Sequence, residues 1–522
     1  MLRGGSPPPT PVQNPTQSYW LRALPTTPRP AAAAPRPRLP AAADVVIIGG
    51  GIAGVSTAYH LRKVAPELQV VLLEARELSH GATGRNGGLL WPALNAPWLK
   101  TAARYGTTEA ARMMAFEVSC LAELTAFIAD TPGLAEEVRF APFRDGAFHL
   151  YEGGAEMELE LAELAAMQQA GLHTDLQPLS RSQTAALLGT DAYVGAVRQP
   201  GVARVWAARL VRALARMAAD AGPPEGLLLA EHSRVTAVEP VSGSGCGGGG
   251  SGGEPEERLC WGGPAVGREL TGTVTRPTAQ NPLLEPEPLD IASMPLLRVV
   301  VEGGDSLLAR RVLHCTNAYG SALLPELRGA LVPVRNHVAA TAPPRPDRPT
   351  GHFPLDAAFY ARGGYVYWSV REDGRVVIGG FRDVIPGLEW GVYDDGTLDE
   401  RVRQQLRTYL PAHFPAVFSG EGQGGHGGLE LEAEWSGILG FTQDRFPFVG
   451  PVPGRRGQFL AAGFSGHGMT RTFTCGRVLA DMLAGRPLDP AFPATWMPAP
   501  GRFGPATPVV PGPEAAAGAV YR

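Results

Sequence analysis

Two glycine-rich segments of this 522-residue chain present main-chain groups that could bind a flat or anionic ligand. The first, "GGGIAG", spans residues 49–54, and the second, "GFSGHGM", spans residues 463–469. Because glycine has no Cβ, a ligand can approach such backbone closely and meet its N–H groups. The segments lie near opposite ends of the chain, so a ligand that touches both requires the chain to fold back on itself.

The first segment has the spacing of a dinucleotide-binding turn. Gly49, Gly51 and Gly54 form a G-x-G-x-x-G pattern directly after the apolar run "DVVII" and at the start of a helix-like segment. The glycines allow a sharp turn, close approach of a pyrophosphate and tight packing of helix on strand. Glu74 ends the next apolar run, where a carboxylate can accept hydrogen bonds from an adenosine ribose. The alternative is a tight structural turn without a ligand.

The flanking sequence predicts the elements that position these turns. "ADVVIIGGGIAGVSTAYHLRKV" and "LQVVLLEA" indicate a βαβ unit, and residues 100–190 have helical apolar spacing. "GYVYWSV" and "GRVVIGGF" alternate as strands of an antiparallel sheet do. "GQFLAAGFSGHGMTRTFTCGRVLADMLAG" predicts a strand, a glycine turn and a helix that ends at Gly485. The first domain is therefore expected to be discontinuous.

Three further motifs, taken with the first turn, resemble those of one flavoenzyme family. They are "GATGRNGG" at 81–88, "CTNAY" at 315–319 and "AAGFSGHGM" at 461–469. In this order the motifs are similar to those of the D-amino-acid-oxidase-like family of FAD-dependent oxidoreductases, especially its γ-glutamylputrescine, glycine and sarcosine oxidising members. The resemblance covers about 44–240 and 296–490. It implies an α/β fold, with a Rossmann-like, discontinuous FAD-binding domain and an α+β substrate domain on a mainly antiparallel sheet.

The expected organisation alternates between these two domains. FAD-binding segments are expected at 44–95, 196–240, 296–332 and 436–490. The other segments are a Pro-rich N-terminal arm (1–43), a helix-rich substrate or cap region (96–195), a low-complexity insertion (241–295), the substrate-domain sheet (333–435) and a C-terminal tail (491–522).

The resemblance also implies which residues surround FAD. The turn at 466–469 would lie at the pyrimidine end of the ring, ahead of a helix whose N-terminal dipole stabilises negative charge on the reduced flavin. The small residues of "GATGRNGG" would lie against the ring, and its polar residues would hydrogen-bond a phosphate or the ring edge. Besides Gly49, Gly51, Gly54 and Glu74, the expected cofactor-binding set is Ala82, Thr83, Arg85, Asn86, Gly87, Gly88, Val235, Thr316, Asn317, Gly466, His467, Gly468 and Met469.

The implied reaction is oxidation of a C–N bond. In the family, an amine carbon held against the flavin gives up a hydride, water hydrolyses the resulting imine, and oxygen or another electron acceptor reoxidises the flavin. The expected partners are therefore a small amine or an amino acid, with or without an N-substituent, and oxygen or another electron acceptor. The cofactor supplies the chemistry, so no catalytic residue is assigned.

The strand-rich region offers candidate substrate contacts. Aromatic side chains can line an amine pocket through cation–π contacts, although cross-strand packing is the alternative role for them. The candidates are Tyr365, Tyr367, Trp368 and His337, with Arg371 and Arg382 as further polar residues of such a pocket.

The chain departs from the family pattern in ways that concern substrate and acceptor. Amino-acid-specific relatives carry an arginine soon after a Trp-Gly pair to clamp a carboxylate, whereas "WSGILGFTQDRFPFVG" has Ile438, Leu439 and Gly440 there. Sarcosine-oxidase relatives carry an oxygen-activating lysine where "GRVVIGG" has valines, so an acceptor other than oxygen is open. The position of a flavin-linking histidine holds Arg85, which favours noncovalent FAD, with His80 as the alternative attachment point.

Composition excludes several classes of partner. A formal charge of −4 without a basic run argues against nucleic acid, and no apolar run is long enough to span a membrane. Five scattered cysteines suggest reduced thiols, and no metal site is expected. These features favour the cytoplasm. The arginine-containing arm 1–43 weakly resembles an organellar transit peptide, but it also reads as an arm anchored by "SYWL" at 18–21.

Two other functions compete with amine oxidation. A tRNA-modifying or hydroxylating flavoenzyme would use the same fold, but the chain lacks a basic face and a second nicotinamide-type glycine motif. A non-catalytic flavin-binding or trafficking-related protein is compatible with the missing carboxylate clamp and the missing lysine. Reduction of the flavin by an amine distinguishes an enzyme from a binding protein.

Overall fold

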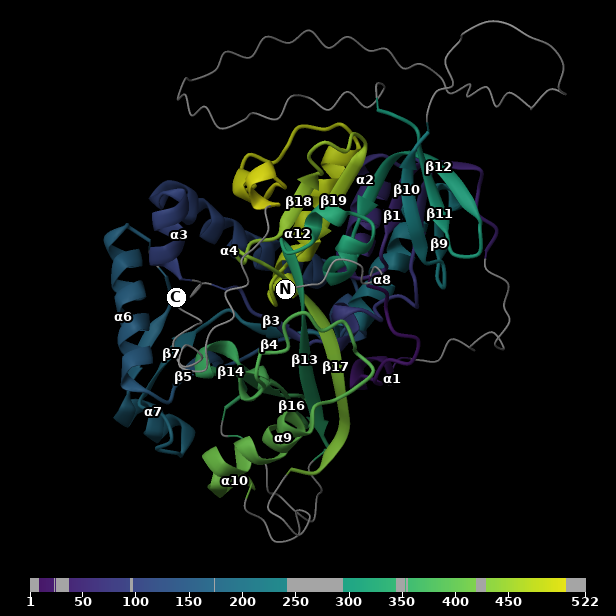
Figure 1. Cartoon of the computed structure of the whole chain (residues 1–522). Coiled ribbons are helices and arrows are strands. Elements are labelled where there is room, and N and C mark those ends of the chain that lie inside the picture. Colours follow the sequence, from purple (N-terminus) through teal and green to yellow (C-terminus); the bar gives the residue numbers. More distant parts are fainter. Residues whose placement is uncertain are drawn as a thin grey trace, which may run out of the picture.

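The computed structural model describes residues 9–22, 24, 37–93, 97–172, 174–241, 294–343, 353, 355–418 and 429–503. Most of the insertion expected at 241–295 lies outside the described residues, as do parts of the N-terminal arm and of the C-terminal tail. The described chain forms two lobes, each built around an eight-stranded sheet (Figure 1). This arrangement confirms the expected fold class.

The first sheet is the Rossmann-like one and lies in the upper half of Figure 1. β1 (Ala42–Ile48) is central and pairs in parallel with β12 (Ser306–His314) and β2 (Val70–Leu73). The sheet is completed by β9 (Leu227–Ala230), β10 (Val235–Pro240), β11 (Leu297–Val301), β18 (Phe448–Pro451) and β19 (Gln458–Ala462). Since β19 pairs with β12, a segment near the end of the chain joins the first domain, as expected for a discontinuous domain.

β1 is apolar throughout because both of its faces are covered. Val45 and Ile47 pack into one hydrophobic cluster, and Val46 and Ile48 pack into another. The first cluster includes residues of α2 (Ile52–Val64), α8 (Ala207–Asp220), α12 (Gly468–Leu483) and α4 (Thr107–Asp130). A strand buried on both faces reads as a continuous apolar run, which explains "DVVII".

The turn between β1 and α2 requires glycine at two of its positions. Gly49 has φ +117°, and a Cβ there would lie 2.5 Å from the Cys315 carbonyl oxygen. A Cβ on Gly54 would lie 2.0 Å from the Gly49 carbonyl oxygen. Any side chain at Gly54 would push α2 away from the strand, so the third glycine sets the helix–strand distance.

The second sheet has the strand order β17-β13-β16-β15-β14-β5-β7-β6 and is antiparallel except for the β14–β5 pair. Its strands are β17 (Leu431–Thr442), β13 (Leu331–Thr341), β16 (Val376–Gly380), β15 (Val366–Val370), β14 (Ala357–Ala361), β5 (Gly146–Tyr151), β7 (Gly195–Gln199) and β6 (Gln177–Ser180). α9 (Glu400–His413) covers one face, and α3 (Trp98–Tyr105), α6 (Gly154–Gln169) and α7 (Arg181–Leu188) lie beside the β5 edge (Figure 1).

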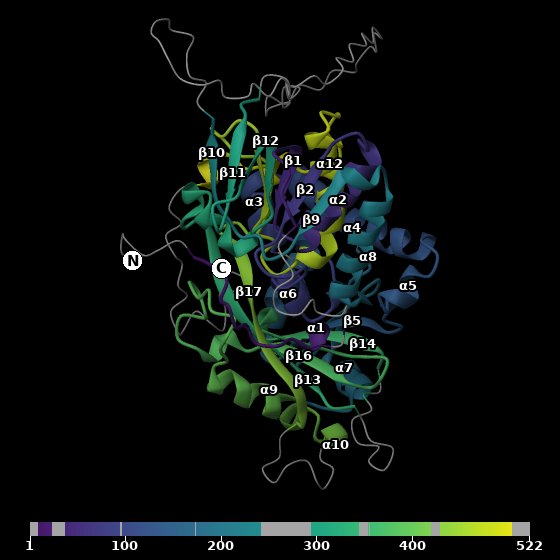
Figure 2. The same cartoon turned by 90° about the vertical axis from the view of Figure 1, so that its right-hand side faces the viewer.

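Two segment boundaries expected from the sequence differ from the structure. The region 96–195 contributes β5 and β6 to the substrate sheet as well as helices, and the boundary at 195/196 falls inside β7 of the same sheet. The boundary at 435/436 falls inside β17, a single strand that runs with β13 from the first lobe into the second (Figures 1 and 2). Long strands shared by two lobes have no composition break at the lobe boundary, so the sequence does not mark it.

The N-terminal segment is packed between the lobes. α1 (Tyr19–Arg22) lies beside β17 and near β16 (Figure 2). Trp20 is completely buried, and its ring makes edge contacts with those of Trp206 and Trp435. The "SYWL" segment is therefore part of the folded core.

The described residues contain no helix that is both long and apolar enough to cross a bilayer. Within the same part of the chain, no three His, Cys, Asp or Glu side chains gather as metal ligands do. Cys120, Cys315 and Cys475 are buried free thiols.

Candidate active site

A cavity of about 230 Å³ lies at the carboxyl ends of the parallel strands β1 and β2, and we call it the edge cavity. Ligands of open α/β sheets bind at this edge. The structure brings most of the expected cofactor residues together here. The edge cavity is lined by Gly49, Gly51, Glu74, Ala82, Thr83, Asn86, Val235, Thr316, Asn317, Gly466, Gly468 and Met469.

Glu74 is held in place by the turn it faces. Its Oε2 accepts a 2.6 Å hydrogen bond from Gly50 N–H, and its Oε1 accepts one of 2.8 Å from Arg76 N–H. Burial raises the pKa of Glu74, although both backbone donors oppose this shift. The carboxylate is thus fixed in the cavity wall with acceptor capacity left for a ligand hydroxyl.

A second cavity of about 490 Å³ lies over the substrate sheet, and we call it the sheet cavity. It meets the edge cavity at two places, the turn after β19 and the loop after β2. Both cavities are lined by Ala82, Asn86, Leu439, Ser465, Gly466 and Met469. The segments 49–54 and 463–469 therefore both border the edge cavity, and the second also borders the adjoining sheet cavity.

The turn at 463–469 is positioned by contacts from two other segments. Asn317 Oδ1 accepts a 3.1 Å hydrogen bond from Gly463 N–H, and Gly440 O accepts one of 2.9 Å from Ser465 N–H. His467 lines the sheet cavity at the start of α12. Burial, with Arg471 and Arg445 nearby, lowers the pKa of His467 to about 3. His467 is therefore neutral at physiological pH and cannot serve as a general acid there.

The loop containing "GATGRNGG" joins the two cavities. Thr83 Oγ1 accepts a hydrogen bond from Ile52 N–H at the start of α2, at 3.1 Å. A Cβ on Gly87 would lie 2.7 Å from Tyr367 Cε2, so Gly87 admits the Tyr367 ring. Gly54 and Gly88 line neither cavity, and Gly88 instead packs against the Trp20 ring.

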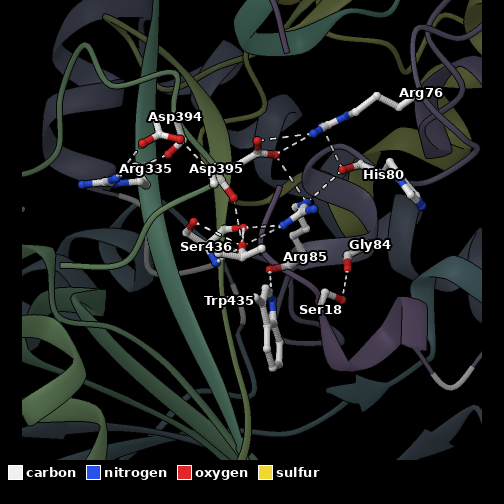
Figure 3. A network of polar contacts seen from close by, with 12 residues as sticks. Ser18, Arg76, His80, Gly84, Arg85, Arg335, Asp394, Asp395, Trp435 and Ser436 are labelled. Carbon is white, nitrogen blue, oxygen red and sulfur yellow. Dashed lines mark hydrogen bonds and ion pairs between the residues drawn. The ribbon is translucent and has the colours of Figure 1, made fainter. Parts of the chain in front are cut away.

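Arg85 takes part in a buried polar network outside the edge cavity (Figure 3). Its guanidinium donates hydrogen bonds to the carbonyl oxygens of Ser436 and His80, at 2.8 and 2.9 Å, and pairs with Asp395 at 3.5 Å. Arg76 pairs with the same carboxylate at 3.0 Å. Burial lowers the pKa of Arg85 to about 10, and Asp395 opposes this shift. Arg85 also lines the sheet cavity, and these acceptors fix its guanidinium in the cavity wall.

His80 also lines neither cavity. Its Nε2 lies 3.3 Å from the Glu77 carboxylate. This position is consistent with the noncovalent FAD that we expected.

Only one of the four candidate substrate residues lines the sheet cavity. Tyr367 does so, and its hydroxyl accepts a 3.0 Å hydrogen bond from Asn336 Nδ2. Trp368 is its neighbour in β15 and therefore points to the opposite face, where it stacks on Phe359. His337 Nε2 accepts a hydrogen bond from Asp399 N–H at the start of α9, and burial lowers the pKa of His337 to about 4. Tyr365 lies outside the cavity lining beneath Arg382.

The sequence did not predict a cluster of aromatic side chains beside Tyr367 in the wall of the sheet cavity. Trp91 stacks on Tyr360 with ring centroids 4.0 Å apart, and His149 makes an edge contact with Trp91. Burial lowers the pKa of His149 to about 4, so this cluster is uncharged. Tyr360 comes from β14, whose apolar run "AAFYA" was a detectable signal, whereas the pairing with Trp91 depends on tertiary contacts.

Charged residues around the sheet cavity leave it with an excess of positive charge. Burial opposes ionisation of Asp444, but its pair with Arg502, with Nε–Oδ2 at 2.8 Å, keeps its pKa below the usual value. Glu156 is partly buried, which raises its pKa to about 7. The basic residues that line the cavity are Arg85, Lys100, Arg104, Arg382, Arg445 and Arg471, of which Arg85 pairs with Asp395 and Arg471 with Glu117.

The Rossmann-like sheet, its glycine turn and the joined cavities define a dinucleotide-dependent oxidoreductase of two lobes. The chain belongs to the family described as "DAO: FAD dependent oxidoreductase", whose model matches residues 44–260 and 294–482. It is an FAD-dependent amine or amino-acid oxidase or dehydrogenase of that family.

Curated relatives match over most of their length. A probable oxidoreductase OrdL from Rhizobium meliloti (strain 1021) is 24% identical over 464 residues, which cover 86% of this chain and 87% of the relative. The gamma-glutamylputrescine oxidoreductase of Escherichia coli (strain K12) is 23% identical over 448 residues, covering 85% and 84%. The crystal structure of glycine oxidase from Geobacillus kaustophilus has a TM-score of 0.62 at 19% identity, covering 88% of this chain and 99% of its own.

The residues present fit FAD. Thr316 Oγ1 is buried in the lining of the edge cavity without a hydrogen-bond partner among the described residues. Gly81 has no neighbour within 4 Å of a built Cβ, and the nearest atom to one on Gly466 is 4.0 Å away. Bare backbone along both cavities leaves room for a flat ring, and the unpaired hydroxyl is available to a ligand.

Proposed function

We propose that this protein oxidises the C–N bond of an amine or N-substituted amino acid, with transfer of a hydride to noncovalently bound FAD and hydrolysis of the imine. The observation that carries the proposal is the junction of the two cavities at the 463–469 turn. An adenosine-binding edge and an aromatic substrate chamber meet there. FAD, when bound, would supply the redox chemistry at this junction.

The side chains of the protein would bind and orient the substrate and exclude water from it. Trp91, Tyr360 and Tyr367 form one continuous aromatic part of the sheet-cavity wall. The excess of arginine and lysine disfavours an ammonium ion, so it lowers the pKa of a bound amine. A neutral amine is the form that can lose a hydride. The N-terminus of α12 faces the junction and favours negative charge there.

The test is anaerobic reduction of the bound flavin. The purified protein loaded with FAD is mixed with diamines, N-methyl amino acids, and D- and L-amino acids, and the visible flavin band is followed. We expect at least one of these compounds to bleach the band. If dithionite bleaches it but every amine and amino acid fails, the protein is a flavin-binding protein without amine oxidation.

The electron acceptor is a separate part of the proposal. Val376 and Val377 are both buried within the substrate sheet, so neither offers a charged group near the junction. We propose an acceptor other than oxygen. The reduced protein should reoxidise slowly in air and faster with an artificial acceptor such as a quinone, which stopped-flow absorbance measures.

A further inference from the structure

The sheet cavity contains a guanidinium without an acceptor. Arg382 follows β16 and lines the cavity, and its Nε is buried without a hydrogen-bond partner among the described residues. No ion pair to Arg382 occurs within the part of the chain that the structure describes. The adjacent carboxylate, Asp383, is hydrogen-bonded to Arg362 instead.

Aromatic rings hold this guanidinium in position. Arg382 Cζ lies 4.7 Å from the ring centroid of Tyr365 and 5.4 Å from that of Phe441. Such cation–π contacts orient a guanidinium but leave its N–H groups unpaired. Burial lowers the pKa of Arg382, Tyr365 opposes this shift and Arg445 adds to it. A second cation is thus near the first, and both line the cavity.

Phe441, which contacts Arg382, lies on β17, the strand that lacks the carboxylate-binding arginine of amino-acid-specific relatives. Leu439 is one of the residues found at that position here, and Phe441 lies two residues further along β17 in the same cavity wall. Arg382 reaches this wall from η7 (Arg382–Val384), a short helical turn after β16. The cation that β17 does not supply is therefore present on a neighbouring element.

We infer that Arg382 is a carboxylate-binding residue and that the substrate is an amine carrying a carboxylate, not a diamine or a simple amine. A carboxylate accepts two parallel hydrogen bonds from a guanidinium, which satisfies the buried donors and offsets the charge. This inference rests on the proposed function, since it specifies the substrate class of the same cavity.

Benzoate, benzamide and benzylamine are suitable probes because they share a ring and differ in charge. Each is titrated into the FAD-loaded protein, and the dissociation constant is read from the perturbation of the flavin absorbance. We expect benzoate to bind at least about tenfold more tightly than benzamide, as expected for charge-assisted hydrogen bonds. Equal binding of benzoate and benzamide, or no binding of benzoate, would overturn the inference.

Three variants then test whether Arg382 is the residue that binds the carboxylate. Arg382→Met should weaken benzoate binding by about tenfold or more and leave benzamide binding unchanged, whereas Arg382→Lys should retain part of the benzoate affinity. Arg328→Met removes a charge from an exposed position that lines neither cavity and should change benzoate affinity by less than about threefold. Unchanged benzoate affinity in Arg382→Met would overturn the assignment.

The benzoate titration and the flavin-bleaching test can give negative results independently of each other. If no amine bleaches the flavin but benzoate binds through Arg382, the anion site stands and the proposed oxidation is wrong. If a diamine bleaches the flavin and a carboxylate-bearing amine does not, the oxidation stands and the carboxylate assignment is wrong.

Discussion

Glu74 connects the cofactor to the turn that binds it. The Glu74→Ala variant removes the carboxylate that we propose binds the ribose of FAD, and it leaves Gly50 N–H without its acceptor. Hydrogen bonds to charged groups contribute about 1.5–3 kcal/mol, so we expect FAD to bind roughly 10- to 100-fold more weakly. Fluorescence titration of the apoprotein with FAD measures the change. Glu239→Gln, an exposed position on β10, is the control and should bind FAD normally.

Glu156 is the carboxyl group of the sheet cavity that titrates near neutral pH. Its pKa is raised to about 7 mainly by burial, so the folded state binds its proton more tightly than the unfolded state does. The contribution of Glu156 to folding stability should therefore fall as pH rises from about 4.5 to 7, and its loss is complete above pH 7. His149 and His467, whose pKa values are lowered to about 4 and 3, contribute in the opposite direction, because the unfolded chain protonates them below its higher histidine pKa and the folded chain does not.

The Glu156→Gln variant isolates this contribution. Relative to the original protein, it should gain about 1–2 kcal/mol of stability between pH 5 and pH 8, after allowance for the partial exposure of the side chain. Urea unfolding at the two pH values measures the difference. A stability difference that does not change with pH would contradict the assignment.

At the scale of elements, the N-terminal segment stabilises the loop at 81–88, which contains "GATGRNGG". Trp20 Nε1 donates a 2.6 Å hydrogen bond to Asn86 O, and Ser18 Oγ donates one of 2.5 Å to Gly84 O. Pro9, Thr10 and Pro11 line the edge cavity itself. The segment therefore forms part of the cofactor site.

Truncation of one side chain tests this role. Replacing a buried tryptophan by alanine costs about 3–5 kcal/mol, so Trp20→Ala should be strongly destabilised and should bind FAD more weakly. Thermal unfolding with and without FAD measures both effects. Trp390→Ala removes the same side chain from an exposed position, 37% accessible, and should retain FAD affinity. Equal behaviour of the two variants would exclude a supporting role for the N-terminal segment.

The sequence correctly predicted those elements whose residue pattern lies within a single continuous segment. The βαβ unit, the terminal strand–turn–helix and the lining residues Gly49, Gly51 and Glu74 follow from glycine spacing and apolar runs, whereas the other expected residues of the edge cavity came from the family resemblance. The substrate side was harder to predict because alternation along β15 places Tyr367 and Trp368 on opposite faces, and the sequence does not say which face meets the cavity. Arg85 illustrates the same limit, since its acceptors come from Thr16, His80, Ser436 and Asp395.

At the scale of the whole molecule, the burial of Trp20 bears on processing of the chain. An organellar presequence that ended near residue 43 would remove Tyr19, Trp20 and Leu24 from a cluster that also contains Trp206 and Trp435. We therefore expect the mature protein to retain residues 18–24. Peptide mapping by mass spectrometry of protein isolated from its native cells checks this. A mature N-terminus beyond residue 24 would show that the fold does not require the segment.

The pairing of β12 with β19 has a consequence for synthesis on the ribosome. A nascent chain that has emerged only as far as β12 has the glycine turn and Glu74, but it lacks β19, the 463–469 turn and α12. Asp395 and β17, which hold the Arg85 loop, also emerge late. FAD can therefore be enclosed only after β19, the 463–469 turn and α12 have been synthesised, so its enclosure follows the folding of the earlier segments rather than guiding it.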